Sequence, residues 1–532
     1  MTEHIYDVIQ VGYGPVSEAL ALMLGRQGRS VAVCERWPTR YPMPRAVCVD
    51  HELYRVLSAN GLGAVLPTIS HPAPPYQWFN ADWQELLVLD MSRTSISGGT
   101  DTNFVHQPTL EQALHEAVRA QPTVDLWLGW EATAVSQDQD LARVAMRNPD
   151  TGETRTLAAR YVVGCDGANS IVRETIGGER EDRGFEADWL VIDVKLKPGV
   201  TIEQLGIPPA GQYCNPVRPT TIVPAGVREG VYFRRWEFML LPGENVADLE
   251  REETVWELLA PWAGPDQVEL VRHKVYNFRS LLAERWRDRR LLLAGDAAHV
   301  MPPFMGQGMC SGFRDAWNLT WKLGLILDGK AGDRLLDTYQ PERLSHVRQI
   351  TDISIYLGKI ICIPDPAAAA ERDQAFLSGQ APPPPPFPSM IEGLVHRTAQ
   401  GELDAGAGLL SPHVDLDVGG KTLRMDEALV GGSGFVVIGR GFDPEAVLAP
   451  KQHRQLAVAA ARYLELGTGS PNAARDLDGR LDSFLDARGW AAMIVRPDFY
   501  IYGGVAAADE LPGLVDDLVA DLTQAGIHIA GA

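Results

Sequence analysis

A glycine-rich turn close to the N-terminus constrains the fold of this 532-residue chain more than any other feature. The turn, 12–17 (GYGPVS), follows a short, mainly apolar run at 5–11 (IYDVIQV). Residues 15–28 have helical spacing, and 30–35 (SVAVCE) has the composition of a second strand. Strands joined by a crossover helix in this way lie parallel in one sheet. The chain therefore predicts an α/β fold that begins with a parallel sheet.

The turn has small residues where a phosphate group would approach the backbone. Gly12 and Gly14 leave room for a pyrophosphate at the N-terminus of the helix. Ser17 replaces the usual third glycine of such turns, and Glu35 ends the second strand 18 positions later, where a carboxylate accepts hydrogen bonds from a ribose. The alternative to nucleotide binding is that these glycines form an ordinary tight turn. The placement favours dinucleotide binding, with these predicted contacts: Gly12, Gly14, Pro15, Val16, Ser17 and Glu35.

The net charge of −21 limits the partners of the protein. So negative a molecule repels nucleic acid and anionic membrane surfaces. An anionic small substrate would need a local arginine pocket that works against the overall field. We therefore expect a small-molecule partner, with neither nucleic acid nor a membrane as a partner.

The cysteines and the N-terminus predict a cytoplasmic protein. The six cysteines form no CxxC pair, which is typical of reduced thiols and implies neither a disulfide framework nor a metal site. Glu3 and Asp7 stand where a signal peptide would be basic. No apolar run approaches the ~18 residues of a membrane span.

Further strands and one long helix are predicted in the middle of the chain. Short apolar strands are expected at 160–165 and 290–295, and the alternation within 186–245 suits antiparallel strands. Residues 308–329 have the pattern of one helix whose large apolar side chains recur at every fourth position and belong to the core. A second, mixed or antiparallel sheet is therefore expected to cover the first domain.

A proline-rich stretch at 381–389 (APPPPPFPS) predicts an extended spacer before a separate C-terminal module. Strands are expected at 434–439, 491–496 and 498–502, and helices at 450–467 and 508–525. This pattern resembles a thioredoxin-like fold. The module lacks the CxxC of redox-active members, so we predict a structural or dimerisation role.

Two later motifs narrow the identity of the nucleotide. Cys165-Asp166-Gly167-Ala168-Asn169-Ser170, with Arg173, resembles the DG motif of class A FAD-dependent aromatic monooxygenases, and Gly295-Asp296-Ala297-Ala298-His299 resembles their GD motif. Together with the glycine-rich turn they identify the chain as a member of the p-hydroxybenzoate hydroxylase superfamily. Strings such as 235–239 (RWEFM), 337–340 (DTYQ) and 496–498 (RPD) resemble most closely the 3-(3-hydroxyphenyl)propionate hydroxylases.

The resemblance implies FAD as cofactor and assigns it further contacts. Asp296 would bond the ribityl chain, and Asp166 would help hold FAD and receive the nicotinamide nucleotide. Arg45 would lie beside the pyrophosphate, and Gln107 would contact FAD at the head of a helix. Amides at the start of the long helix would face the negative charge of a reduced flavin. The remaining predicted FAD contacts are Gly295, Pro303, Gly306, Gln307 and Gly308.

The resemblance also implies how the domains divide. An FAD-binding domain is predicted from 1–75, 98–185 and 272–362, and a substrate domain from 76–97 and 186–271. The proline-rich linker is placed at 363–390 and the thioredoxin-like domain at 391–532.

The implied reaction uses NADH or NADPH and O₂ to hydroxylate a phenolic ring, giving a catechol. Arg218 and Arg235 are candidates for gripping a propionate tail, although pairing of Arg235 with Glu237 is equally consistent with its position. Phe304 lies at the predicted flavin face and would shape the substrate cavity. The candidates for relaying the phenol proton, each with an ordinary packing role as the alternative, are His51, Tyr213 and Tyr232.

Other functions remain open at this stage. The same framework serves hydroxylases of polyketides and resorcinols and enzymes of Baeyer-Villiger chemistry. A non-catalytic flavin-binding protein is a further alternative. The resemblance implies a homodimer, and the choice between NADH and NADPH is open.

Overall fold

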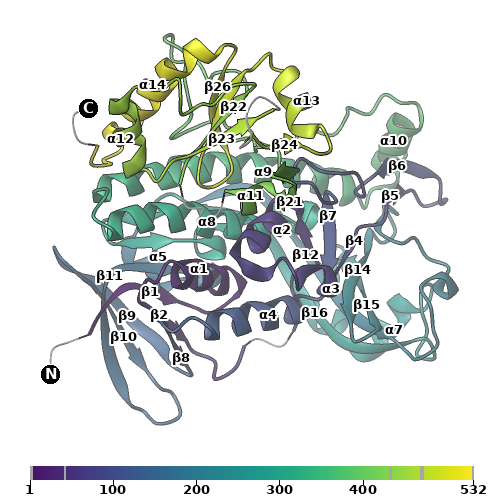
Figure 1. The fold of residues 1–532 in the computed structure, drawn as a ribbon. Coiled ribbons are helices and arrows are strands. Elements are labelled where there is room, and N and C mark those ends of the chain that lie inside the picture. The colour runs from purple at the N-terminus through teal and green to yellow at the C-terminus, as the bar shows by residue number, and fades with distance from the viewer. Residues whose placement is uncertain (1–3, 41–42, 430–433, 468–472, 530–532) are drawn as a thin grey trace.

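A parallel sheet at the centre of the first domain is built as the sequence predicts (Figure 1). The computed structural model describes residues 4–40, 43–429, 434–467 and 473–529. The sheet has the order β17 (Arg287–Asp288), β18 (Leu291–Leu293), β11 (Thr154–Gly164), β1 (Ile5–Val11), β2 (Val31–Glu35) and β8 (Val124–Leu128), and the antiparallel strands β10 (Ala142–Arg147) and β9 (Glu131–Gln137) extend from β11. The pairs from β18 to β8 are parallel.

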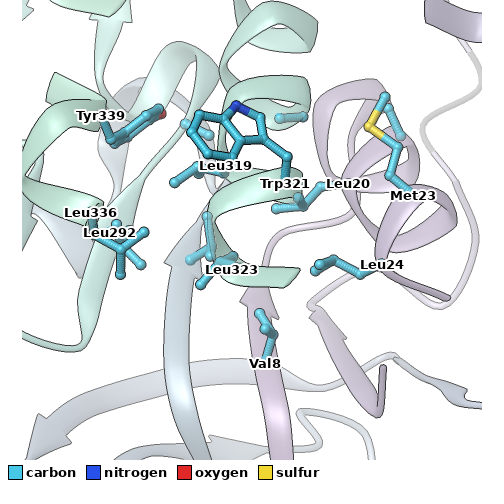
Figure 2. Close-up of a cluster of buried hydrophobic side chains, with 14 of the residues drawn as sticks. Val8, Leu20, Met23, Leu24, Leu292, Leu319, Trp321, Leu323, Leu336 and Tyr339 are labelled. Carbon is cyan, nitrogen blue, oxygen red and sulfur yellow. The ribbon is translucent and has the colours of Figure 1, made fainter. Parts of the chain in front are cut away.

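Two helices cover one face of this sheet. The helix α1 (Pro15–Arg26) follows the glycine-rich turn, and α8 (Gly308–Leu327) is the long helix predicted near 308–329. Figure 2 shows leucines of both helices around Trp321 and above Val8 of β1. These side chains are almost completely buried, and burying each one contributes about 1.5–3 kcal/mol. The packing fixes the N-termini of both helices at the same edge of the sheet.

The second sheet is antiparallel except for one pair, as expected of the substrate-covering layer. Its order is β19 (His299–Val300), β16 (Val268–Ala283), β12 (Arg180–Leu196), β15 (Val231–Met239), β14 (Thr220–Arg228), β13 (Gly211–Tyr213), β5 (Tyr76–Phe79) and β6 (Glu85–Leu89). Only β13 and β5 pair in parallel among these described strands. β12 and β16 run without a break across the boundaries predicted at 185/186 and 271/272. The division into domains therefore stays a prediction.

Smaller elements join the two sheets. A small sheet contains β3 (Cys48–Asp50), β7 (Thr102–Val105) and β4 (Ser70–Pro72). The connecting helices are α2 (His51–Leu57), α3 (Leu66–Ile69), α4 (Gln107–Arg119), α5 (Ile171–Ile176), α6 (Val246–Leu249), α7 (Glu252–Leu259), α9 (Tyr339–Ile361) and α10 (Pro366–Leu377). Short 3-10 or π turns are η1 (Ser58–Leu62), η2 (Gly167–Asn169), η3 (Glu203–Leu205), η4 (Gly295–Ala297), η5 (Pro303–Met305), η6 (Asp333–Thr338) and η7 (Ala508–Glu510). The proline-rich stretch 381–389 contains neither helix nor strand.

The C-terminal module has a thioredoxin-like topology. Its main sheet has the order β23 (Arg462–Leu466), β22 (Val436–Arg440), β25 (Ala492–Val495) and β26 (Ile501–Val505), with the first pair parallel and the others antiparallel. Its helices are α11 (Met425–Ala428), α12 (Pro450–Val458), α13 (Arg480–Asp486) and α14 (Leu511–Gln524). A small sheet of β21 (Lys421–Arg424), β20 (Asp415–Val418) and β24 (Arg475–Asp476) lies beside it.

Two predicted elements of this module are wrong in extent. The helix predicted at 450–467 ends at Val458, because Ala460 has a φ of 52° and the chain then enters β23. Pairing with β22 outweighs the helical propensity of these residues. The strand predicted at 498–502 begins only at Ile501, since Phe499 has a φ of 71° and forms a turn.

A buried ion network joins the module to the first domain. Glu342 of α9 accepts hydrogen bonds from Lys322 of α8 and from both terminal nitrogens of Arg496. Arg496 also donates to Asp498. The three side chains Lys322, Glu342 and Arg496 have no exposed surface, and the two cations hold the pKa of Glu342 well below its ordinary value despite burial.

No single helix among the described residues has both the length and the apolar character to cross a membrane. One bent pair, Asp333–Ile361 with Pro366–Leu377, meets the same criterion when its two helices are taken together.

Removing one partner of the buried network will destabilise the protein strongly. Arg496→Leu leaves Glu342 and Asp498 buried without their guanidinium, which costs about 3–5 kcal/mol. The matched control is Arg475→Leu, whose ion pair with Asp417 is partly exposed and contributes about 1 kcal/mol or less. Thermal unfolding followed by circular dichroism measures both midpoints. Equal midpoints for the two variants would show that the network does not anchor the module.

Candidate functional site

A cavity of about 1310 Å³ lies between the two sheets. It opens where the parallel strands end, because Val11, Glu35, Cys165 and Ala294 all line it. In open α/β sheets this edge is where ligands bind. The volume exceeds the roughly 300–1,000 Å³ of an ordinary ligand pocket and leaves room for a dinucleotide together with an aromatic ring.

The glycine-rich turn forms one end of the cavity. Gly12 has a φ of 92°, and a Cβ atom there would lie 2.5 Å from the carbonyl oxygen of Cys165. Gly14 is different, because its φ of −85° suits any residue and a Cβ atom would meet nothing within 4 Å. That open space adjoins the N-terminus of α1, where backbone amides favour a phosphate. Gly14, Pro15 and Val16 all line the cavity.

Val16 joins the turn to two other segments. Its side chain lies where a Cβ atom on Gly295 or Gly312 would stand, at 3.1 Å and 2.4 Å. Ser17 faces away from the cavity and is hydrogen-bonded within the core to Gln10. The structure thus brings Gly295 and the start of α8 against the first turn, and it places Ser17 in packing.

The carboxylate of Glu35, at the end of β2, is oriented by two backbone hydrogen bonds. One carboxylate oxygen accepts the backbone N–H of Tyr13 at 2.8 Å, and the other accepts that of Trp37 at 2.9 Å. Each oxygen keeps a lone pair for a further donor, and the residue lines the cavity. This arrangement suits two neighbouring ribose hydroxyls.

Asp296 points into the cavity from a rigid loop. It is an exposed residue of the cavity lining, and desolvation by the surrounding protein raises the pKa of its carboxyl group. Asp315 of α8 holds the loop by accepting the N–H of Gly295 at 3.0 Å and by contacting His299 at 2.6 Å. Arg343 donates to the same carboxylate, and the contacts with His299 and Arg343 keep the pKa of Asp315 below its ordinary value despite burial.

Arg45 and Gln107 lie together at the cavity wall. The side-chain oxygen of Gln107 accepts the backbone N–H groups of Arg45 and Ala46 at 2.7 Å and 2.5 Å. Its amide nitrogen donates to Glu111. Gln107 therefore orients the segment that presents Arg45, and both residues line the cavity.

The segment with Asp166 adjoins the same space. One oxygen of Asp166 accepts the N–H of Ile171 at 2.8 Å, whereas Oδ1 is buried without a hydrogen-bond partner among the described residues. Arg173 donates to the carbonyls of Ala168 and Ala297, which ties this segment to the Asp296 loop. The predicted FAD contacts just before and at the start of α8 also line the cavity: Pro303, Gly306, Gln307 and Gly308.

The opposite half of the cavity is largely aromatic. Phe304 packs against Trp189 and Phe278 with ring centroids 5.8 Å and 6.3 Å apart, and Phe185 lies at 5.6 Å. Phe304 and Phe278 line the cavity together with Trp78. These aromatic side chains can pack against the apolar faces of a flat substrate ring.

The guanidinium of Arg235 lies at this half, but it is already engaged. It donates to Asp193 at 2.7 Å and 3.1 Å and to the backbone carbonyls of Pro44 and Arg45. Arg272 donates to the same Asp193 at 2.7 Å and to the hydroxyl of Tyr276. Asp193 thus joins two cations on adjacent strands, and the alternative partner Glu237 is 3.8 Å from Arg235.

A row of polar side chains crosses the second sheet beside this cluster, and sequence reasoning missed it. Thr221 donates to Gln212 at 2.7 Å, and Gln212 donates to the hydroxyl of Tyr76 at 2.7 Å. Glu237 stands directly opposite Thr221 in the register, and all four residues line the cavity. A signal was available at Glu237 alone, because this charged residue stands between Trp236 and Phe238 in a predicted strand.

Three predicted substrate or relay residues lie away from the cavity lining. Arg218 pairs with Glu244 and donates to the carbonyl of Met239. Tyr213 stacks on Trp83 and donates to the carbonyl of Ala81, and Tyr232 is 46% exposed at the start of β15. Alternation along β13 and β15 turned Tyr213 and Tyr232 to other faces, and Arg218 lies in the turn before β14, so we do not retain their predicted roles.

His51 does line the cavity. It begins α2, and its Nδ1 lies 3.1 Å from the hydroxyl of Ser97. The preceding residue, Asp50, caps this helix and is paired with Arg314.

The comparisons with known proteins decide the family. The family model described as "FAD binding domain" matches residues 5–354. A second model, described as "HcaD C-terminal domain", matches residues 406–521. The chain belongs to the FAD binding domain family.

Relatives in this family cover nearly the whole chain. A "Probable NADH-specific resorcinol 4-hydroxylase" from Rhodococcus jostii (strain RHA1) is 37% identical over 97% of this chain and 94% of that protein. A "3-(3-hydroxy-phenyl)propionate/3-hydroxycinnamic acid hydroxylase" from Klebsiella pneumoniae subsp. pneumoniae is 34% identical over 94% of this chain and 92% of that protein. The fold matches a crystal structure of aklavinone-11 hydroxylase with FAD and aklavinone at a TM-score of 0.77, 22% identity and coverage of 98% and 100%.

The family member described here is thus an FAD-dependent aromatic monooxygenase, as the sequence motifs predicted. The residues present fit FAD: Gly14 leaves open space for a phosphate at a helix N-terminus, and Asp166, whose Oδ1 has no hydrogen-bond partner among the described residues, lines the same cavity. Glu35, Arg45 and Asp296 supply the polar contacts that a dinucleotide requires.

Gly14→Val will weaken FAD binding without unfolding the chain. The valine side chain meets no protein atom near its Cβ but fills the space beside the N-terminus of α1, so we expect affinity for FAD to fall at least about tenfold. Fluorescence titration of the FAD-free protein with FAD measures the affinity. The control is Gly513→Val, at an exposed glycine of α14 that also has nothing within 4 Å. Unchanged FAD affinity in Gly14→Val would contradict the assigned phosphate position.

Proposed function

We propose that the protein hydroxylates a small, uncharged dihydric phenol of the resorcinol type, with FAD as cofactor and with O₂ and NADH as co-substrates. Similarity to the resorcinol 4-hydroxylase of Rhodococcus jostii supports the substrate class and the choice of NADH. The observation that carries the proposal is the state of the arginines at the aromatic half of the cavity. Arg235 and Arg272 both donate to Asp193. Arg235 also donates to the carbonyls of Pro44 and Arg45, and Arg272 to the hydroxyl of Tyr276, so few of their N–H groups are left to bind a substrate carboxylate.

The side chains around the cavity suit such a substrate. The aromatic wall with Phe304 packs against the ring, and the row from Tyr76 to Glu237 offers donors and acceptors to two hydroxyl groups. Bound FAD, once reduced, supplies the oxygen activation, which is chemistry of the cofactor itself. The protein orients the phenol and keeps bulk water from the reacting ring.

An acidic phenol such as 3-(3-hydroxyphenyl)propionate is the second candidate. Arg279 favours it, because this residue lines the cavity, is about half exposed and contacts Glu186 only at 3.8 Å. A guanidinium in that state is available for a carboxylate, unlike that of Arg235. The hydroxyphenylpropionate hydroxylase relative supports the same reading.

Several sequence predictions stay proposals. We infer a structural role for the thioredoxin-like module because it lacks CxxC. The homodimer, the cytoplasmic location and the domain boundaries remain predictions from the sequence. We assign the FAD contacts to the cavity-lining residues named above and retain Arg235 and Phe304 as substrate neighbours.

Resorcinol will stimulate NADH oxidation and O₂ uptake in equal amounts and gain one oxygen atom. The reason is that a neutral, electron-rich ring fits the aromatic half of the cavity. The assay uses a panel of phenols. An oxygen electrode measures O₂ uptake, and mass spectrometry measures the mass of each product. Preference for a large polycyclic substrate, or loss of NADH without any oxygenated product, would contradict the proposed function.

Arg279→Gln decides between the two substrate classes. If acidic phenols are the substrates, the KM for a hydroxyphenylpropionate will rise about tenfold or more while that for resorcinol stays the same. If the substrate is an uncharged dihydric phenol, as we propose, the KM values for both compounds will change little. Arg218→Gln is the control, because Arg218 is paired with Glu244 outside the cavity lining.

A further inference from the structure

Glu237 is a buried carboxylate that faces the cavity without a close partner. It is 8% exposed and lies on β15, directly opposite Val191 and Thr221 of the neighbouring strands. Its one ionic contact among the described residues is with Arg235 at 3.8 Å, and no side-chain or backbone donor is hydrogen-bonded to it there. A buried carboxylate in this condition carries a large desolvation cost unless a ligand supplies a donor.

The charged groups near Glu237 lie on β15 itself, on its neighbour β12 and on β16, the strand beyond β12, whereas the other neighbour, β14, places Thr221 opposite Glu237. Arg235 stands two residues before it, and Arg272 and Asp193 approach from β16 and β12. Burial raises the pKa of the Tyr76 hydroxyl on β5, and the nearby Glu237 raises it further. Burial is the largest influence on Glu237 and raises its pKa, while Arg235 and Arg272 act in the opposite direction.

Several other acids and bases that line the cavity are already engaged or lie at its nucleotide half. Asp50 is paired with Arg314 and caps α2, and Glu111 accepts a hydrogen bond from Gln107. His51 contacts the hydroxyl of Ser97. Asp296 lies with the nucleotide-binding turns rather than on the second sheet. Glu237 is therefore the carboxylate best placed to meet a group bound at the aromatic half.

We propose that Glu237 is the catalytic base that accepts the proton of the substrate's phenolic hydroxyl. The O–H bond of the phenol breaks, its electron pair stays on oxygen as phenolate, and the proton forms a new O–H bond on the Glu237 carboxylate. No electrons are exchanged in this step. The inference rests on the proposed function, because it requires a phenol in the cavity.

The step matches the acidity of the two groups. A free phenol has a pKa of about 10, so at neutral pH almost none of it is ionised. A carboxylate whose pKa is raised by burial is a stronger base than an exposed one and removes the proton more readily. Arg235 and Arg272 then lie near the negative charge that develops on the phenolate oxygen and stabilise it.

Glu237→Gln will lower kcat about 100-fold at neutral pH, because an amide cannot accept the proton. In the wild type, kcat falls as the pH drops through the pKa of Glu237 and the carboxylate becomes protonated. In the variant this acid limb disappears, and the rate instead rises toward pH 10 as the phenol ionises by itself. The pH profile of kcat with resorcinol measures both effects.

A second substrate keeps the test independent of misfolding. For a phenol whose own pKa lies below the assay pH, wild type and Glu237→Gln should have rates within about threefold of each other, because no proton has to be removed. Glu269→Gln is the matched control, an exposed glutamate on β16 that pairs with Lys195. FAD content of each variant is measured alongside.

The outcomes separate the inference from the function it rests on. A wild type that oxidises no phenol overturns the proposed function itself. An active wild type with an unchanged pH profile in Glu237→Gln overturns the assignment of Glu237 alone. A profile that changes instead in His51→Asn would assign the base to His51 and contradict the proposal.

Discussion

The close contact of three backbone turns at one edge of the parallel sheet is the constraint on which the rest of the site depends. Gly12 lies against the carbonyl of Cys165, and Val16 fills the space left by Gly295 and Gly312. No side chain larger than hydrogen fits at these glycines without displacing backbone or Val16. Because these contacts are fixed, the amides of α1 and the carboxylate of Asp296 face the same cavity.

Buried ion pairs outside the cavity also hold this geometry in place. Asp315 holds the Asp296 loop, and Glu342 joins α8 and α9 to the C-terminal module through Lys322 and Arg496. A buried carboxylate with several donors is stable only in one arrangement, so such clusters specify geometry more than they add stability. The module therefore supports the cavity through α8, although it contributes no redox cysteine pair.

Much of the fold follows from the sequence because its signals are local. The first strand and helix, the helix starting at Gly308 and the thioredoxin-like topology were all predicted from periodicity and turn residues. The half of the cavity that would hold the substrate was harder to predict from the sequence. Arg218 and Tyr213 were chosen for their chemistry, but strand alternation and pairing with Glu244 decide where they point. Glu237 was considered only as a partner of Arg235, since Asp193, the true partner, is distant in sequence.

The central claim is that one cavity holds both the flavin and a phenol whose oxygen meets Glu237. A crystal structure of the FAD complex soaked with resorcinol tests it most directly. The account predicts the resorcinol ring against Phe304, with one oxygen within hydrogen-bonding distance of the Glu237 carboxylate. A flavin bound away from Gly14 and Asp296, or a phenol oxygen held by other residues with Glu237 unoccupied, would contradict it.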